Sequence, residues 1–336
     1  MKAFVLEKPA LVEEKPMRLV ETGKPELLPD EVLVRVTACG VCRTDLHVCE
    51  GELAHRRPRI IPGHQIVGRV TELGEDVESL SIDDRVGIAW LNRTCGVCRY
   101  CETNRENLCE SADFTGWTVH GGFAEFAKAP AGFVYPIPGG FSDTQAAPLL
   151  CAGIIGYRAL SLTGIDKSSA AGAKLGIYGF GAAGHVCIQI ARSWGMEVYV
   201  ATRDRSRHQA LAEELGAEWV GETYDPLPVR LDASIVFAPA GEIVPAALES
   251  LDKGGTLVLG GIYMSPIPQF KYELLYGERV IRSVSNNTRE DGREFLLNAE
   301  SAGVRTHVEE YPLEAAGEVL VSLKHDAIRG AAVLKV

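Results

Sequence analysis

The sequence lacks the features of an exported or membrane-spanning protein. Its 336 residues contain no uninterrupted apolar run of the roughly 18 residues needed to cross a bilayer. Residues 1–6 resemble a strand that carries one lysine, not a charged segment followed by an apolar one, so no signal peptide is expected. These absences predict a cytoplasmic protein without a membrane partner.

A surplus of basic residues is absent too. The formal net charge of −11 argues against nucleic acid or an anionic membrane surface as the main partner. Hydrophobic residues make up 46% of the chain, which is enough to fill hydrophobic cores. Because 336 residues exceed what one core usually organises, two domains are expected.

Without an export signal, the nine cysteines are not expected to form disulfides, because a reducing compartment keeps thiols free. Four of them, Cys95, Cys98, Cys101 and Cys109, follow the spacing C-x2-C-x2-C-x7-C. Two-residue spacers let successive thiolates turn onto one ion, and the longer spacer lets the fourth complete a tetrahedron. Four sulfur ligands with no open position predict a structural zinc site. An iron–sulfur cluster and unmetallated thiols are the alternatives.

The first half of the chain, to about residue 148, is rich in strand-like segments punctuated by glycine and proline. Residues 31–37 alternate charged and apolar side chains, as a half-buried strand does, and residues 85–89 and 124–127 are similar. A β-rich, barrel-like domain is therefore expected in this half.

From about residue 175 the pattern changes to strands alternating with helices. Six apolar strands are expected, at 175–178, 198–201, 218–221, 233–238, 256–260 and 280–285. Helices are expected at 182–194, 206–215 and 244–251. Short strands separated by helices predict a parallel sheet, and six is the strand number of a Rossmann dinucleotide-binding sheet. Helices at 289–300 and 314–323 and a strand at 331–336 should then return to the first domain.

A glycine-rich loop follows the first of these six strands. Gly179, Gly181 and Gly184 form a G-x-G-x-x-G pattern between an apolar strand and a helix. In this context the glycines allow a tight turn and a close approach of the backbone to a pyrophosphate, which lies at the helix N-terminus. A plain glycine-rich turn is the alternative.

The end of the second strand should distinguish the two nicotinamide cofactors. NAD enzymes place an acidic residue there for the adenosine ribose, whereas this chain has Thr202 and Arg203, followed by Arg205 and Arg207. Clustered arginines suit a 2′-phosphate, which favours NADP(H). NAD(H) stays possible, with Asp204 reaching the ribose and the arginines forming a solvated surface.

Three further segments carry candidate catalytic residues: CGVCRTDLH at 39–47, PGHQIVG at 62–68 and LLCAGIIGY at 149–157. In these segments the chain closely resembles the zinc-dependent medium-chain alcohol dehydrogenases. The resemblance extends over essentially the full length, since the cysteine cluster and the glycine loop fall in the family's order. It implies a catalytic zinc held by Cys42, His64 and Cys151, three ligands that leave a fourth position open. Without it, Cys151 reads as a small buried residue.

The resemblance also implies the roles of neighbouring residues. Zinc lowers the pKa of a bound alcohol or polarises an aldehyde, and Thr44 accepts the alcohol proton and passes it through the nicotinamide ribose to His47. Asp45 then holds the second ring nitrogen of His64, and Arg43 lies against the cofactor pyrophosphate. A surface histidine without a relay role is the alternative for His47.

The substrate pocket implied by the resemblance is lined by Thr44, Leu53, Trp90 and Trp117. Yeast-type ethanol dehydrogenases carry a tryptophan where this chain has Leu53, so a roomier pocket is expected. Trp117 as a core residue is the alternative. The family commonly has glutamate after the histidine ligand, and this chain has Gln65, which leaves the tuning of the zinc by that charge open.

Together these features predict an α/β protein with two domains. Residues 1–152, with 286–336 returning to them, form a β-rich GroES-like catalytic domain, and residues 153–285 form a six-stranded parallel Rossmann domain. The active site is expected in the cleft between them. The resemblance implies an enzyme that moves a hydride between a small or medium primary or secondary alcohol, or its aldehyde or ketone, and NAD(P).

Two rival functions remain. A zinc-free quinone or enone reductase of the same superfamily lacks the ligand set that Cys42, His64 and Cys151 provide. A non-catalytic nucleotide-binding protein of this fold would not need Thr44 and His47. We expect a homo-oligomer, and the absence of the extra length of the dimeric vertebrate enzymes favours a tetramer over a dimer.

Overall fold

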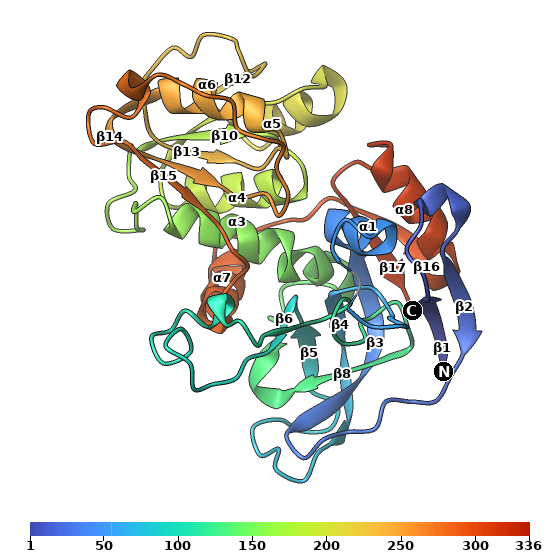
Figure 1. The fold of residues 1–336 in the computed structure, drawn as a ribbon. Helices are drawn as coiled ribbons and strands as arrows, with labels where there is room; N and C mark the ends of the chain where they lie inside the picture. Colours follow the sequence, from blue (N-terminus) through green and yellow to red (C-terminus); the bar gives the residue numbers. More distant parts are fainter. Residues whose placement is uncertain (55) are drawn as a thin grey trace. The chain divides into compact units, whose positions relative to one another are not determined.

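The computed structural model describes residues 1–54 and 56–336 (Figure 1). Contacts within the chain divide it into two units. Unit 1 contains Met1–Cys151, Thr288–Glu300 and Arg305–Val336, and unit 2 contains Ala152–Asn287 and Ser301–Val304. None of the helices in the described part of the chain is both long and apolar enough to span a bilayer.

Unit 1 is built on a seven-stranded sheet. Its strand order is β16-β17-β3-β4-β5-β9, and β8 pairs with β3 off this path. The strands are β3 (Glu31–Val41), β4 (Gln65–Leu73), β5 (Arg85–Ile88), β8 (Phe126–Pro130), β9 (Val134–Pro136), β16 (Val308–Pro312) and β17 (Ala331–Lys335). Two-stranded sheets add β1 (Lys2–Leu6) with β2 (Met17–Glu21), and β6 (Leu91–Arg93) with β7 (Asp113–Phe114).

Strand β3 is longer than residues 31–37 because its apolar face continues to Val41, and it is buried along most of its length. The register against β4 shifts twice, between Leu33 and Val34 and between Val36 and Ala38. Such irregularities bend a strand and let a sheet curve. The strand expected at 124–127 begins instead at Phe126, since Ala124 forms only an isolated bridge with Ala3.

The described helices that lie in or begin in unit 1 are α1 (Arg43–Glu50), α2 (Asp143–Ala146), α7 (Arg289–Ser301) and α8 (Ala316–Lys324). Helix α8 begins two residues later than expected because a 3-10 turn, Leu313–Ala315, precedes it. The last strand, β17, pairs antiparallel with β3 and parallel with β16. The C-terminal segment is thus an internal strand of the sheet.

Unit 2 contains a six-stranded sheet in which all neighbours are parallel, with the order β12-β11-β10-β13-β14-β15. The strands are β10 (Lys174–Tyr178), β11 (Glu197–Ala201), β12 (Trp219–Gly221), β13 (Leu231–Val236), β14 (Leu251–Leu259) and β15 (Val280–Ser283). The helices are α3 (Ala152–Ser161), α4 (Ala182–Ser193), α5 (Ala210–Glu214) and α6 (Val244–Glu249). Counted from β10, this order is 3-2-1-4-5-6, that of a Rossmann fold.

Several elements of unit 2 differ from the expected pattern, and α3 was not among the helices expected. The helix expected at 206–215 starts as a π-helical turn, Arg205–Gln209, before α5. Strand β14 begins at Leu251, five residues earlier than expected, because Leu251 already pairs with Leu231 of β13. Helix α6 therefore ends at Glu249, two residues earlier than expected.

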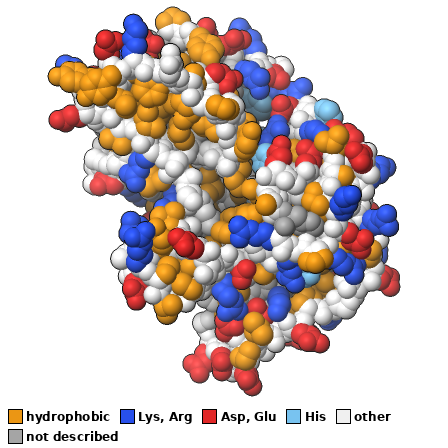
Figure 2. Space-filling model, in the orientation of Figure 1, with side chains coloured by type: hydrophobic (Ala, Val, Ile, Leu, Met, Phe, Trp, Pro, Cys, Tyr) orange, Lys and Arg blue, Asp and Glu red, His pale blue; other side chains and the backbone are white. Residues whose placement is uncertain are grey.

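Strand β15 forms one edge of this sheet, and its side chains are largely exposed. Figure 2 shows hydrophobic side chains gathered over the region that β13, β14 and β15 occupy in Figure 1. The exposed large hydrophobic residues of unit 2 include Ile262, Ile267, Tyr272, Tyr276 and Val280. Apolar surface beside an open sheet edge is typical of a site that another chain covers.

Candidate metal and cofactor sites

The N-terminus of α1 presents the first group of candidate residues. Cys42 has an extended backbone, and its N–H donates to Asp45 Oδ2 at 2.9 Å. This contact starts the helix directly after β3 and fixes the position of Cys42. Thr44 and His47 follow on the same helix three residues apart, so they lie on one face of it.

Cys42, His64 and Cys151 come together although they lie far apart in the sequence. Their donor atoms lie within 4.8 Å of one another, and Cys42 Sγ is 3.4 Å from His64 Nε2. Zinc bonds of about 2.3 Å to sulfur and 2.0 Å to nitrogen place tetrahedral S and N ligands about 3.5 Å apart. Two sulfurs and one nitrogen at this spacing therefore fit a zinc ion with a fourth position open.

Local backbone geometry holds His64 in place. Gly63 has a φ of 95°, and a Cβ there would lie 2.5 Å from the ring of Phe123. Only glycine suits both constraints. His64 follows this turn and immediately precedes β4.

Asp45 lies behind His64 and is only 1% exposed. His64 Nδ1 donates to Asp45 Oδ1 at 3.0 Å, and the Gly63 N–H donates to the same oxygen at 3.2 Å. Nε2 faces Cys42, and a metal ion binding there displaces the proton that this nitrogen carries in the imidazolium form. Burial lowers the pKa of His64, but the charges of Asp45 and Cys42 outweigh it and raise the pKa to about 10. Burial raises the pKa of Asp45.

The two thiols of this site share a hydrogen bond. It lowers the pKa of Cys42 well below its usual range and raises that of Cys151. One sulfur of the pair is thus predisposed to be a thiolate, the form that binds metal.

We expect Asp45→Asn to weaken zinc binding at this site by about 10- to 100-fold, because the histidine ligand loses its charged partner. Competition with a chromophoric chelator measures the affinity. Asp76→Asn, at an exposed carboxylate of the same unit, is the matched control. Equal affinities in both variants would contradict a supporting role for Asp45.

Gln65 follows the histidine directly and is 2% exposed. Its Nε2 has no hydrogen-bond partner among the described residues, and a Cβ on Gly40 would lie 2.8 Å from its Oε1. Gly40, its pairing partner on β3, therefore makes the space that this side chain fills. The amide adds no charge to a buried site that already holds Asp45.

Helix α1 also carries the two residues assigned to proton transfer. Thr44 is buried, and His47 Nδ1 contacts the Glu52 carboxylate. The sequence pattern did not indicate Glu52. Arg43 forms an ion pair with Asp326, so its guanidinium already has a carboxylate partner.

The aromatic residues beside His64 form a stack. The Trp90 ring meets the His64 ring edge-on at 5.1 Å, and Trp117 stacks on Trp90 at 5.8 Å. The Arg56 guanidinium lies 4.8 Å from the Trp117 ring centroid. Leu53, Trp90 and Trp117 are all partly buried and pack against the hydrophobic core of unit 1. Sequence reasoning missed Arg56, since no motif contains it.

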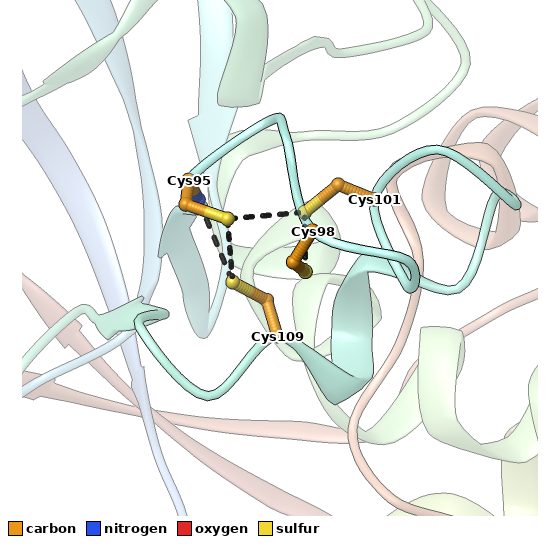
Figure 3. Close-up of side chains that lie close together, drawn as sticks. All are labelled: Cys95, Cys98, Cys101 and Cys109. Atoms are coloured by element: carbon orange, nitrogen blue, oxygen red, sulfur yellow. Dashed lines mark hydrogen bonds between the residues drawn. The ribbon is translucent and has the colours of Figure 1, made fainter.

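The four clustered cysteines lie in one loop and form a compact group (Figure 3). The Sγ atoms of Cys98 and Cys101 are 3.6 Å apart, as are those of Cys109 and Cys95, and Cys95 and Cys101 are 4.0 Å apart. Zn–S bonds of about 2.3 Å give tetrahedral sulfurs about 3.8 Å apart. An iron–sulfur cluster would hold the sulfurs farther apart, because irons and sulfides lie between them. The spacing fits a single closed zinc site.

In this cluster the sulfurs differ in their surroundings. A hydrogen bond from the Val97 backbone is the largest effect that lowers the pKa of Cys95, to about 7. Burial raises the pKa of Cys109 to about 11. The backbone N–H of Cys95 also points at Cys109 Sγ, at 3.5 Å, an interaction that stabilises a thiolate.

The glycine loop connects β10 to α4 in unit 2. Gly179 has a φ of 88°, and a Cβ there would lie 2.8 Å from the Ala238 backbone nitrogen. A Cβ on Gly184 would lie 3.0 Å from the Gly179 oxygen, so this glycine lets the helix pack closely. A Cβ on Gly181, the residue before α4, would meet nothing within 4 Å. Open space at a helix N-terminus suits a pyrophosphate.

The residues after β11 are arranged around Asp204. Its Oδ1 accepts from the backbone of Ser206 at 3.2 Å and of Arg207 at 3.1 Å, and its carboxylate pairs with the Arg207 side chain. The Ser206 hydroxyl also donates to Oδ1 at 2.8 Å. This bond is the largest effect that lowers the pKa of Asp204, and the backbone bond from Arg207 adds to it. Thr202 is buried, whereas Arg203 is exposed and forms no ion pair among the residues described.

Comparison with known proteins gives the family. Residues 28–139 match the alcohol dehydrogenase GroES-like domain, and residues 182–301 match the zinc-binding dehydrogenase domain. The chain is 47% identical to the "Probable alcohol dehydrogenase AdhA" of Mycobacterium tuberculosis, over 99% of this chain and 97% of that protein. It is 38% identical to an alcohol dehydrogenase of Geobacillus stearothermophilus, over 98% and 99%.

Solved structures agree with the sequence comparison. An alcohol dehydrogenase from Aeropyrum pernix superposes with a TM-score of 0.86 at 27% identity, over 100% of both chains. A cinnamyl alcohol dehydrogenase of Sorghum bicolor gives a TM-score of 0.89 at 25% identity, over 99% of this chain and 97% of that one. Fold and site define a zinc-type dehydrogenase with a Rossmann domain. The chain belongs to the zinc-dependent medium-chain alcohol dehydrogenase family.

Proposed function

We propose that this protein is an NAD(P)-dependent alcohol dehydrogenase for small or medium primary or secondary alcohols and the corresponding aldehydes or ketones. The observation that carries the proposal is the donor set of Cys42, His64 and Cys151 within 4.8 Å, with Thr44 on the adjoining helix. Three ligands with an open fourth position are the arrangement of catalytic zinc.

In this proposal each residue has a defined task. When bound, zinc supplies a Lewis acid for the substrate oxygen and the nicotinamide supplies or accepts the hydride. Thr44 accepts the proton of the alcohol hydroxyl, and His47 takes up the released proton at its ring. Asp45 keeps His64 in the tautomer that can bind metal. Trp90, next to His64, lines the substrate side with Trp117 and Leu53.

We propose a second zinc in the group of Cys95, Cys98, Cys101 and Cys109. The sulfur spacing of 3.6–4.0 Å supports a closed, structural role. The glycine loop, with Gly179, Gly181 and Gly184, binds the cofactor pyrophosphate. For Arg43 to contact the pyrophosphate as well, its guanidinium must leave the Asp326 carboxylate.

For the cofactor we propose a preference for NADP(H). Asp204 is engaged with the backbone that follows it, so it is a poor candidate for holding a ribose. Arg207 pairs with Asp204. Of the two other exposed arginines, Arg203 and Arg205, Arg203 directly follows the buried Thr202 near the end of β11, and this position favours it for binding a 2′-phosphate.

Arg203→Ala is therefore expected to lower kcat/KM with NADPH about tenfold to a hundredfold, the effect of losing one charge-assisted contact. kcat/KM with NADH should hardly change. Initial rates with both cofactors measure the ratio, and Arg230→Ala, at another exposed arginine of unit 2, is the control. A wild-type enzyme that prefers NADH would refute this assignment.

A panel of alcohols and aldehydes assayed with both cofactors tests the function itself, by the absorbance of the reduced nicotinamide. Turnover of enones or quinones alone would favour the zinc-free reductase class instead. Cofactor binding without turnover of any substrate would favour a non-catalytic protein.

We also propose that the chain assembles into a homo-oligomer, a tetramer in preference to a dimer. The exposed hydrophobic residues near the open edge strand β15 support association of copies through unit 2. Light scattering after size-exclusion chromatography measures the mass of the assembly, and a monomer would contradict the proposal.

A further inference from the structure

The end of helix α1 is shaped so that the chain turns back onto His47. The helix ends at Gly51, whose φ is 81°, and the Leu53 N–H donates to the His47 carbonyl at 3.2 Å. A Cβ at position 51 would lie 2.9 Å from Pro9 Cβ, so glycine is required for both conformation and space. Residue 52 is thereby brought next to His47.

The side chain brought there is a carboxylate. Glu52 contacts His47 Nδ1 and is half-exposed, while the His47 side chain is only 14% exposed. The other nearby carboxylate, Glu50, is occupied elsewhere, because it accepts from Lys324 at 2.8 Å and from the Val12 N–H at 3.0 Å. Glu52 is therefore the acidic residue of this turn that faces the imidazole.

A carboxylate can only accept a hydrogen bond at neutral pH, so this contact places the imidazole proton on Nδ1. The second ring nitrogen, Nε2, then carries a lone pair and can accept a proton. The reverse tautomer would present a proton where the relay needs an acceptor.

We propose that Glu52 is a positioning residue for alcohol oxidation, which holds His47 in the tautomer with Nδ1 protonated. This inference rests on the proposed function. The proton released from the alcohol adds to Nε2, the imidazole becomes a cation beside the Glu52 carboxylate, and Nε2 then returns that proton to water. The hydride leaves separately to the nicotinamide, so protons and electrons balance.

The tautomer itself is the first test. Nitrogen-15 NMR of the histidine-labelled, zinc-loaded enzyme distinguishes the two tautomers, and the spectrum of His47→Gln identifies the His47 signals. We expect protonated Nδ1 in the wild type and in Glu52→Gln, whose amide oxygen still accepts. Glu52→Ala should shift His47 toward protonated Nε2. A wild type protonated on Nε2, or an unchanged tautomer in Glu52→Ala, would overturn the proposal.

Kinetics give the second test. Glu52→Ala should lower kcat for alcohol oxidation about twofold to tenfold at unchanged KM, the size expected for one lost hydrogen bond. Glu52→Gln should retain most of the rate. Glu14→Ala, at an exposed glutamate in the neighbouring 3-10 turn, is the control and should match the wild type. Thermal melting verifies that each variant is folded.

The double variant His47→Gln/Glu52→Ala distinguishes a failure of the Glu52 role from a failure of the proposed function. If His47→Gln slows oxidation, adding Glu52→Ala should slow it no further, since both changes remove one function. If His47→Gln slows oxidation and Glu52→Ala does not, the role of Glu52 is refuted while the proposed function stands. If His47→Gln has no effect, the relay fails, and the role of Glu52 fails with it.

Discussion

Replacing Thr44 by valine is expected to lower kcat for alcohol oxidation by about 10²- to 10⁴-fold, the usual contribution of a positioned proton-transfer group. Valine keeps the shape of the buried side chain and removes only the hydroxyl. The fold and the metal ligands should therefore survive, and the loss should fall on kcat. Initial rates over a range of alcohol concentrations, with metal content determined on the same samples, measure it.

Thr44→Ser provides the matched control, because it keeps the hydroxyl and loses only a methyl group. It should retain most of the activity. A Thr44→Val enzyme that oxidises alcohols at near the wild-type rate would show that another group, or water, accepts the proton, and the assignment made by resemblance would be wrong for this chain.

The second large effect concerns metal content. We expect two zinc ions per chain by elemental analysis, and His64→Ala should leave one and reduce oxidation about a thousandfold or more. Cys101→Ser should also leave one, but its main effect should be on stability, with Tm falling by about 10 °C because a structural zinc contributes to folding. Titration with a chelator should abolish turnover before the fold is lost, since only the open site admits a competing ligand.

Cys187→Ser is the control for loss of a thiol, because this buried cysteine of unit 2 belongs to neither group of ligands. It should keep both zinc ions. One zinc in the wild type, or iron with labile sulfide, would contradict the assignment of the two sites.

The parallel sheet of unit 2 could be predicted because each strand is a short apolar run between helices. Strands buried on both faces leave this local signal, and β10, β11 and β13 lie within a few residues of the expected ranges. The cysteine cluster was predictable for the same reason, as all its ligands lie in one loop. The spacing of the cysteines along the chain is therefore enough to predict this site.

Helix α1 was not predicted, since its eight residues make little more than two turns and its apolar residues are few, Leu46, Val48 and Cys49. It forms because Asp45 caps Cys42, and tertiary contacts with His64 fix both residues. The contact between His47 and Glu52 depends on the turn at Gly51. The contact between Arg56 and Trp117 joins segments that are distant in the sequence. Contacts of this kind arise from the folded backbone, so periodicity could not predict them.

The pairing of β17 with β3 has a consequence for synthesis on the ribosome. Residues 332–335 pair with residues 38–41, so the N-terminal sheet must wait for a strand translated after the whole nucleotide-binding unit. Until then residues 38–41 of β3 lack this partner, whereas residues 31–35 can already pair with β8. Unit 2, whose strands pair among residues 174–283, can fold first. We therefore expect this edge of β3 to stay open to wrong pairing until the last strand is made, and zinc binding at Cys42 to follow chain completion.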